Sequence, residues 1–346
     1  MPEPLRVAAI TAGRRDPGAR FRVGQFAVSL RDHDVDLAWL PAPIAKYPPR
    51  WRPLRPLWLP AAVAGRVPAT VASWRADVTL LAREMVSTLV TLEPLTRRPR
   101  VLDVDDAIWL RRGGGFARRL AGLVDLVIAG NQYVGAWFAD RGARVEILPT
   151  AVDVARFSPG SPQPGAVQPH HLTIGWCGTS GNQPALLAIE DALARVLQAR
   201  PRARVQICSD RPPRWRSLPA ARWDFVPWSA AAEVAFFRNL DIGLMPLRDD
   251  PWSRGKCAYK MLLYLACGVP AVVSPVGMSA VVLGQAQAGI GAVSESAWTD
   301  ALIDLLDDDG LRAAMSRAGR KLVVECYSVD SLAPRLAALL RSVVTG

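Results

Sequence analysis

The sequence predicts an α/β protein made of two domains. With 346 residues, the chain is longer than one ordinary hydrophobic core supports. Short apolar runs alternate with helix-length segments in both halves, and apolar runs without strict alternation are typical of parallel strands covered on both faces. A stretch rich in Pro, Gly and Ser separates the halves. We therefore expect a first domain at residues 1–155, a linker at 156–170, a second domain at 171–330, and a C-terminal helix at 331–346 that can pack back on the first domain.

The composition limits the classes of partner. Half of the residues are hydrophobic and 21% are charged, which is typical of a globular chain. The net charge of +11 favours an anionic partner: nucleic acid, an anionic membrane surface or a phosphorylated substrate. Five cysteines without CxxC spacing and three histidines predict neither a disulfide framework nor a metal site. No run is long and apolar enough to span a membrane and no leader is apparent, so we expect a cytoplasmic protein.

The first domain opens with a predicted strand at residues 5–11, a turn rich in Gly and Arg, and a predicted helix at 23–31. A strand that leads through a glycine-containing loop into a helix is the usual start of a nucleotide-binding type of domain, although the spacing here is not GxGxxG. Arg20 and Arg22 lie where the loop meets the helix, so we expect both to face a cleft. A second strand is predicted at 35–40.

Residues 41–76 interrupt this alternation of strands and helices. The segment has little periodicity and contains Trp51, Trp58 and Trp74 among prolines and arginines. Such a composition suits contact with an anionic membrane surface, a loop that covers a substrate, core packing, or a grip on single-stranded nucleic acid. The sequence leaves these four alternatives open.

The next pair of predicted strands, at residues 77–82 and 100–104, leads to three carboxylates at the end of the second strand. Asp103 and Asp105 share one side if the strand continues, and Asp106 can cap the turn that follows. The carboxyl ends of parallel strands are where α/β proteins place ligand-facing groups. One of these carboxylates can hold a substrate hydroxyl or act as a base, and capping alone is the structural alternative.

Two further polar residues also follow predicted strands. Asn131 and Thr150 are placed at the cleft on this ground, with turn or cap chemistry as the alternative. The predicted elements around them are a basic, Gly-rich loop at 111–119, a strand at 125–129, a helix at 132–140 and a strand at 145–148.

The second domain begins with a predicted strand at 172–177 and a loop of small residues that opens a helix at 184–198. Backbone N–H groups of such a loop can cradle a phosphate. The loop consists of Gly178, Thr179, Ser180, Gly181 and Asn182. The elements predicted after it are strands at 203–208 and 223–226 and helices at 230–237, 297–306 and 311–325.

Residues 241–277 form the most informative stretch. Strands are predicted at 242–247 and 269–274, with a short helix from about residue 255 between them, which is a βαβ unit. Lys256 and Lys260 are four residues apart and would share one face of that helix. Cations at a helix N-terminus are unfavourable unless an anion offsets them, and Gly255 leaves room for a ligand. We therefore predict a phosphate site here.

Several segments resemble a bacterial branch of the GT-B glycosyltransferases of family 4. The matching strings are RFRVGQF, LDVDDAIWL, AGNQYV, ILPTAVD, IGWCGTSGN and DIGLMPLRDDPWSRGKCAYKMLLYLACGVPAVVSPVG, spread over residues 20–277. The resemblance implies two Rossmann-like domains that face each other across a cleft. It also implies a retaining transferase that takes a sugar from a nucleotide diphosphate-sugar without a metal or other cofactor.

The resemblance assigns roles to the candidate residues. The donor would lie on the second domain, with its diphosphate held by the loop at 178–182 and by Gly255, Lys256 and Lys260. Lys260 would also stabilise charge on the leaving group. The acceptor would lie on the first domain, where Asp105 or Asp106 would orient the sugar or the acceptor hydroxyl.

The sequence departs from the family pattern at an acidic pair. Many members carry two glutamates eight residues apart, and the matching positions here hold Gly255 and Leu263. The second glutamate typically binds the donor ribose. Lys256, Lys260 and Tyr264 lie on one face of the predicted helix and could replace it, and Tyr264 could equally be a core residue. The branch has either rearranged its donor site or lost transfer.

Four functions follow from these observations. The leading prediction is a transferase of cell-surface polysaccharide or glycolipid assembly that lies on the inner face of the cytoplasmic membrane and uses a glycan or lipid-linked acceptor. The alternatives are a catalytically degenerate protein that binds a nucleotide sugar or a partner without transfer, a nucleotide-sugar epimerase, and a nucleic-acid-binding protein. No nucleic-acid motif supports the last, so we expect no nucleic acid partner.

Overall fold

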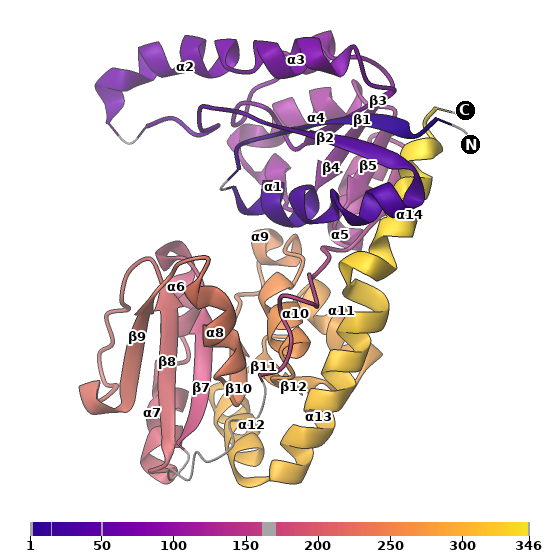
Figure 1. Ribbon diagram of the computed structural model, residues 1–346. Coiled ribbons are helices and arrows are strands. Elements are labelled where there is room, and N and C mark those ends of the chain that lie inside the picture. Colours follow the sequence, from indigo (N-terminus) through magenta and orange to yellow (C-terminus); the bar gives the residue numbers. More distant parts are fainter. Residues whose placement is uncertain (1–2, 15, 50, 161–170, 345–346) are drawn as a thin grey trace. The chain divides into compact units, whose positions relative to one another are not determined.

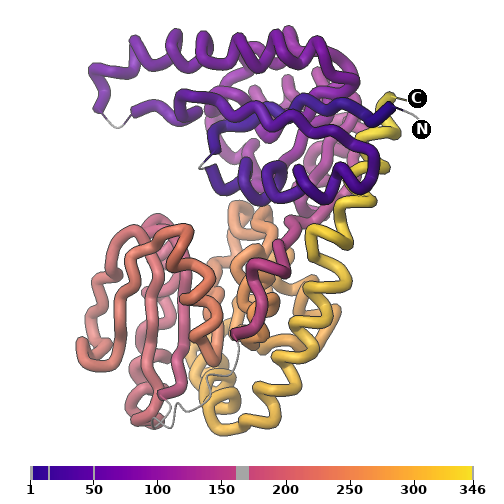
Figure 2. The backbone as a smooth tube through the Cα atoms, in the orientation of Figure 1, coloured from indigo at the N-terminus to yellow at the C-terminus, as the bar shows by residue number. Residues whose placement is uncertain are grey.

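The computed structural model describes residues 3–14, 16–49, 51–160 and 171–344. The chain divides into two compact units. Unit 1 contains residues 1–151, 255–257 and 329–346, and unit 2 contains residues 152–254 and 258–328. Each unit holds one parallel sheet with helices, and the tube in Figure 2 follows the chain from strand to helix to the next strand.

The sheet of unit 1 has six parallel strands in the order β2-β1-β3-β4-β5-β6 (Figure 1). Neighbouring residues along the strands alternate between two hydrophobic cores: Val101 lies in one core and Leu102 in the other. Both faces of the sheet are therefore covered, as the non-alternating apolar runs predicted. The strands are β1 (Leu5–Thr11), β2 (Val35–Pro41), β3 (Val78–Ala82), β4 (Arg100–Val104), β5 (Leu126–Ala129) and β6 (Val145–Ile147).

The C-terminal helix belongs to unit 1. Helix α14 (Val329–Arg341) buries Leu332, Leu336 and Leu340 in the same core as strands β1 and β4. Nη2 of its Arg341 donates a hydrogen bond to the backbone oxygen of His33. The other α-helices of unit 1 are α1 (Pro17–Arg22), α2 (Arg55–Ala64), α3 (Val67–Ser73), α4 (Gly115–Ala121) and α5 (Gln132–Ala139).

The sheet of unit 2 also has six parallel strands, in the order β12-β11-β10-β7-β8-β9. Its strands are β7 (Leu172–Cys177), β8 (Ala203–Ser209), β9 (Trp223–Pro227), β10 (Ile242–Met245), β11 (Ala271–Val273) and β12 (Gly289–Gly291). Its helices are α6 (Gln183–Leu187), α7 (Glu190–Ala199), α8 (Ala232–Arg238), α9 (Pro251–Arg254), α10 (Tyr259–Ala266), α11 (Met278–Gln285), α12 (Glu295–Asp307) and α13 (Asp309–Leu322).

The start of unit 2 lies before the predicted linker. The backbone N–H of Val152 donates to the oxygen of Tyr327 at 2.7 Å, and Phe157 is fully buried in the core of unit 2. The first residues of the predicted linker are thus held by packing, with Arg238 donating to the oxygen of Ser158 at 2.9 Å. Residues 161–170 of the predicted linker lie outside the described residues.

Two predictions for unit 1 are wrong in detail. The α-helix expected at residues 23–31 is not formed, and this stretch holds two short 3-10 turns, Gly24–Phe26 and Ser29–His33. The α-helix of this region is α1, which precedes it, because Asp16 caps α1 by accepting from the N–H of Ala19 at 3.2 Å and Pro17 suits its first turn. The irregular segment expected at 41–76 contains helices α2 and α3, each with a proline near its start. Among the described residues, no helix has the length and apolar character needed to cross a membrane.

Candidate functional site

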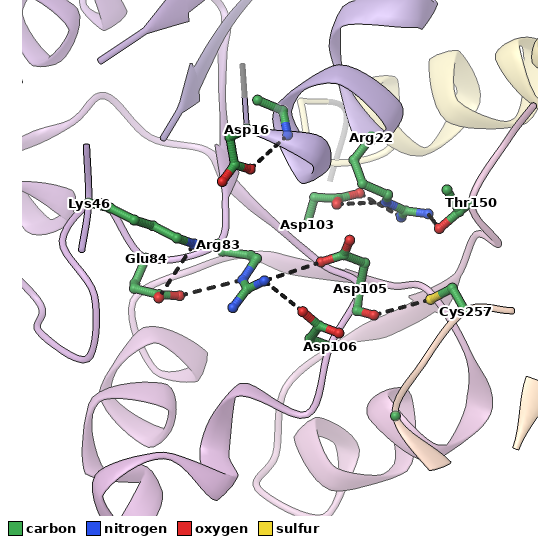
Figure 3. A network of polar contacts seen from close by, with 12 residues as sticks. Asp16, Arg22, Lys46, Arg83, Glu84, Asp103, Asp105, Asp106, Thr150 and Cys257 are labelled. Carbon is green, nitrogen blue, oxygen red and sulfur yellow. Dashed lines mark hydrogen bonds and ion pairs between the residues drawn. The ribbon is translucent and has the colours of Figure 1, made fainter. Parts of the chain in front are cut away.

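In unit 1 the candidate site lies where the strand order reverses. Strand β1 pairs with β2 on one side and with β3 on the other, so the chain returns across β1 between these two strands. Ligands of open α/β sheets bind beyond the carboxyl ends of the strands at such a switch point. Polar side chains from α1 and from the ends of β3 and β4 form the network shown in Figure 3.

Arg22 and Asp103 form a buried ion pair within this network. Nε of Arg22 donates to Oδ1 of Asp103 at 2.9 Å, and Nη2 donates to Oδ2 at 2.7 Å. The two side chains are 2% and 4% exposed. Burial alone would lower the pKa of Arg22, but the charge and hydrogen bonds of Asp103 outweigh it, so the pKa is raised. The placement of Arg22 at a cleft and of Asp103 among the ligand-facing carboxylates is therefore wrong, because each side chain is buried against the other.

Thr150 and Asn131 are also buried, and their side chains contact other parts of unit 1. The hydroxyl of Thr150 lies 3.4 Å from Nη1 of Arg22. Oδ1 of Asn131 accepts from the N–H of Val134 at 2.9 Å and so caps α5, which is the capping alternative. Nδ2 of Asn131 donates to the oxygen of Gly255 at 2.9 Å. Neither side chain lines an open cleft, contrary to the prediction.

Asp105 and Asp106 are the carboxylates that remain accessible, with 21% and 27% of their side chains exposed. Nη1 of Arg83 donates to Oδ2 of Asp106 at 2.8 Å and lies 3.8 Å from Oδ1 of Asp105. Burial and the Asp105 charge raise the pKa of Asp106, and the charges of Arg83 and Lys256 oppose this shift. The two adjacent carboxylates are therefore held together by one guanidinium.

Arg83 also begins a chain of buried charges that the sequence did not predict. Its Nε lies 3.8 Å from Oε2 of Glu84, and Oε1 of Glu84 lies 3.6 Å from Nζ of Lys46. Glu84 and Lys46 are almost fully buried. Within the described part of the chain, Nε and Nη2 of Arg83 and Oδ1 of Asp105 have no hydrogen-bond partner. Buried polar atoms without a hydrogen bond are rare in folded proteins, so this cluster is unusual among the described residues.

The backbone of Arg83 is in the left-handed region, with φ at 66°. This conformation is unfavourable for any residue other than Gly, and such strain is concentrated at functional sites. Arg83 follows strand β3 directly, and a charged residue immediately after a buried strand is the signal by which the sequence could have identified it.

The segment at residues 255–257 completes the network of unit 1. Sγ of Cys257 donates to the backbone oxygen of Asp105 at 3.2 Å (Figure 3). Burial, followed by the Asp105 charge, raises the pKa of Cys257 to about 12. A Cβ atom on Gly255 would lie 2.7 Å from Cβ of Ala107, so glycine is needed for this close approach. The structure thus brings Lys256 near Asp106 in unit 1, where its charge opposes the rise in the pKa of that carboxyl.

Arg20 is half-buried on α1, and its guanidinium lies 5.0 Å from the centre of the Phe21 ring. This geometry is a cation–π contact. Arg20 remains a candidate cleft residue.

In unit 2 the strand order reverses between β7 and β10, and the small-residue loop follows β7. A Cβ atom on Gly178 would lie 2.6 Å from Nζ of Lys260, so the ammonium group contacts the start of the loop. The same ammonium group lies 4.9 Å from the centre of the Trp176 ring. Gly178 and Lys260, predicted separately from the sequence, are thus brought together at a switch point.

The remainder of the loop is held by its own hydrogen bonds. Asp210 accepts from the backbone N–H of Ser180 at 2.6 Å and from its hydroxyl at 2.8 Å. These hydrogen bonds lower the pKa of Asp210, and the bond from the backbone N–H of Ser180 has the largest effect. Nδ2 of Asn182 donates to the hydroxyl of Thr179 at 3.0 Å, and Gly181 is exposed.

Tyr264 is a core residue and not a donor contact. It is fully buried, its hydroxyl accepts from the N–H of Cys177 at 3.1 Å, and the backbone oxygen of Leu244 lies 3.2 Å away. Burial raises its pKa well above the ordinary value. The core alternative for Tyr264 is therefore the one that the structure supports, because its polar atom is already occupied by backbone groups.

Lys256 and Lys260 do not share a helix face, contrary to the prediction. Helix α10 begins at Tyr259, and its N-cap residue Ala258 has a left-handed backbone with φ at 51°. Lys256 precedes the helix, whereas Lys260 lies in its first turn. The predicted continuous helix from about residue 255 is interrupted because residues 255–257 adopt no regular structure.

Residues 171–308 match the family model of Glycosyl transferases group 1. Curated protein sequences give no significant match.

Solved structures match nearly the whole chain. Sucrose-phosphate synthase from Thermosynechococcus elongatus matches with a TM-score of 0.73 and 14% identity, covering 99% of each chain. Anabaena HepE in complex with UDP and glucose matches with a TM-score of 0.69 and 14% identity, covering 98% of this chain and 100% of that chain. The chain has the GT-B fold. WaaG, a glycosyltransferase involved in lipopolysaccharide biosynthesis, gives a TM-score of 0.63 and 13% identity over 96% of this chain and 99% of that chain.

The GT-B assignment confirms the fold predicted from the sequence resemblance. Within this GT-B chain, the matched segment contains the Gly178 loop and Lys260. The network around Arg83 lies outside the matched residues, so it is described by the geometry of unit 1 alone.

Proposed function

We propose that the protein is a retaining glycosyltransferase that moves a sugar from a nucleotide diphosphate-sugar to a glycan or lipid-linked acceptor in cell-surface polysaccharide or glycolipid assembly. The match of residues 171–308 and the GT-B fold support a transferase. A solved complex of Anabaena HepE with UDP-glucose supports a nucleotide sugar as the donor class. The proposal includes no metal ion or other cofactor.

The observation that carries the proposal is the approach of Lys260 to Gly178. The ammonium group lies where any Cβ on Gly178 would collide with it, at 2.6 Å. A cation beside a glycine loop after a parallel strand is a suitable site for a diphosphate, because backbone N–H groups and the ammonium both favour negative charge. In the reaction, charge grows on the diphosphate as the sugar leaves, so Lys260 would stabilise that charge.

On the acceptor side we assign Asp105 and Asp106. They are the partly exposed carboxylates at the switch point of unit 1, and a carboxylate there can accept a hydrogen bond from an acceptor hydroxyl. Arg83 fixes both side chains, so it is a positioning residue. Lys256 remains a proposed anion contact, with its charge near Asp106.

A protein that binds the donor without transfer is the second candidate. The specific observation in its favour is Gly255, where the family resemblance places a glutamate and where Ala107 leaves no room for a side chain. The other position of that pair, Leu263, is buried in the core of unit 2. A donor site without this acidic pair could retain affinity for the nucleotide sugar and lack turnover.

The two candidates separate in one experiment. The protein is incubated with UDP-, GDP-, ADP- and dTDP-sugars, with and without glycan or lipid acceptors, while nucleoside diphosphate release and binding heat are measured. Release that depends on an acceptor supports transfer. A product in which the transferred sugar keeps its anomeric configuration supports the retaining reaction. Binding without release under every condition selects the second candidate, and neither binding nor release contradicts both.

Two lysine variants, one at the proposed donor site and one away from it, test the site itself. We expect Lys260→Ala to weaken nucleotide-sugar binding about tenfold, as loss of a charge-assisted contact does. Lys321→Ala is the matched control, because Lys321 is exposed and pairs at 4.0 Å with Glu325 in the same unit. Equal affinities of both variants and the unmodified protein would remove Lys260 from the donor site.

The place of action belongs to the same proposal. We place the protein in the cytoplasm, on the inner face of the membrane, because the net charge of +11 favours an anionic surface. A lipid-linked acceptor would be reached from that surface.

A further inference from the structure

Helix α2 exposes apolar side chains on nearly all sides. Ala62 is its single buried residue, and every residue of the helix except Arg55 has an apolar or aromatic side chain. Leu57 is 72% exposed, and Trp51, just before the helix, is 65% exposed. A helix this short is marginal in water by itself, and exposed apolar patches mark interaction surfaces. The surface of this helix is therefore available to an apolar partner.

The exposed surface continues beyond α2. Helix α3 follows directly, as Figure 1 shows, and carries Val71 and Trp74 at 61% and 59% exposure. Residues 37–76 contain no Asp or Glu and six Lys or Arg. Two of these cations, Lys46 and Arg66, are buried, so the basic surface comes from the remaining arginines that the structure describes. An apolar surface with basic residues and tryptophans is typical of contact with an anionic membrane.

A basic cavity lies beside α2. Its volume is about 590 Å³, and Arg55, Arg111 and Arg112 line it. No Asp or Glu of the described residues lines it. Guanidinium groups hold phosphate by paired hydrogen bonds, so a cavity lined by three of them suits an anionic group.

The walls of the cavity combine polar and apolar groups. Thr88 contributes a hydroxyl, whereas Trp58 and Leu59 contribute apolar surface from α2 itself. This arrangement matches a ligand that has a phosphate at one end and hydrocarbon next to it, and it is less suited to a free phosphate.

The backbone of the cavity is strained at two places. Thr88 has φ at 63° and Arg112 has φ at 46°, both in the left-handed region that favours glycine. A β-branched residue such as Thr is especially unfavourable there, and such strain persists where the surrounding structure fixes a functional geometry.

We infer that α2 binds the surface of an anionic bilayer and that a phospholipid phosphate enters the cavity of Arg55, Arg111 and Arg112. This inference deepens the proposed function and rests on its assignment to a membrane surface. A ten-residue helix is about 15 Å long, half of the roughly 30 Å hydrocarbon core, so α2 lies along the interface and does not cross it. Leu57 and Leu59 contact the acyl chains, and the cavity fixes the headgroup.

Vesicle flotation tests the cavity. The full chain is mixed with phosphatidylcholine vesicles, with or without phosphatidylglycerol. We expect binding to the anionic vesicles, and the triple variant Arg55→Gln, Arg111→Gln, Arg112→Gln should lower it at least about tenfold. The charge-matched control is Arg31→Gln, Arg214→Gln, Arg335→Gln, whose three arginines are exposed elsewhere on the chain. Equal losses in both triple variants would overturn the cavity assignment and leave only net charge.

A second pair of variants tests the apolar contact. We expect Trp51→Ser with Leu57→Ser to abolish flotation, with an unchanged melting temperature because both side chains are exposed. Val293→Ser with Val281→Ser is the control, since these valines of unit 2 are 82% and 48% exposed. Undiminished flotation of the Trp51 and Leu57 variant would overturn the inference. Flotation requires no donor or transfer, so its failure is distinguishable from failure of the nucleotide-release assay.

Discussion

Gly255 and Ala107 approach so closely that a Cβ atom on Gly255 would lie 2.7 Å from Cβ and 2.9 Å from the backbone nitrogen of Ala107. Both residues are buried. The position at which the sequence resemblance places a glutamate is therefore closed to any side chain.

Reintroducing the acid should consequently damage the protein. We expect Gly255→Glu to lower the free energy of unfolding by at least about 1–3 kcal/mol, as overpacking does, and to add no transfer activity. Urea unfolding measures the first effect and nucleotide release the second. Gly284→Ala is the control, since its Cβ would meet no atom within 4 Å and it lies in helix α11. A stable and more active Gly255→Glu protein would contradict the packing argument.

Gly178→Ala should weaken donor binding because its Cβ would collide with Lys260 and with the Trp176 ring, both at 2.6 Å. We expect about a tenfold rise in the dissociation constant of UDP or another nucleoside diphosphate, which is ~1.4 kcal/mol. Gly181→Ala in the same loop is the matched control, because its nearest atom would be Oγ1 of Thr179 at 3.9 Å. Isothermal titration calorimetry compares the two, and equal affinities would separate the loop from the donor.

The buried pair of Arg22 and Asp103 should be costly to break from one side. We expect Arg22→Met to lower the free energy of unfolding by about 3–5 kcal/mol, because it leaves the Asp103 carboxylate buried without its partner. The double variant with Asp103→Leu should recover part of this loss. Urea unfolding of both single variants and the double variant gives the coupling energy, and additive losses would show that the two charges do not stabilise each other.

Asp106 should lose its proton at a higher pH than an ordinary Asp, because burial and the Asp105 charge raise its pKa. The folded state then holds the proton more tightly than the unfolded chain, so this contribution to stability is present at low pH and is lost as the pH rises through the folded pKa. We expect Asp105→Asn to lower the Asp106 pKa, since it removes a negative charge. NMR titration of the carboxyl carbons measures the Asp106 pKa in the unmodified protein and in the Asp105→Asn variant. An Asp106 pKa that is the same in both would contradict the coupling.

Local sequence patterns predicted most of the strands and the loop at 178–182. The strand at residues 5–11 is observed as predicted, since a buried parallel strand needs a continuous apolar run that is visible in the sequence. The start of α10 was placed too early because Ala258 adopts a left-handed backbone that its side chain does not announce. Helices α2 and α3 were missed because their apolar residues face outward and follow no helical periodicity.

The candidate site was predicted in part. Asp105 and Asp106 were selected because they follow a strand, and the structure leaves both partly exposed. The same rule selected Asp103, which is buried against Arg22. Arg83 was not assigned to the site, because its role depends on the pairing of β3 with β4, which brings the ends of these strands together.

The sequence by itself determined the α/β class and the residue types available for an anion site, because these follow from local apolar periods and composition. It also predicted a two-domain organisation. Only the tertiary structure decided which charges are paired and which stay accessible. Lys260 contacts Gly178, and Arg83 joins Asp106, through packing between residues far apart in the chain. Such contacts depend on distances of a few ångströms between strand ends, which no local pattern of residues specifies.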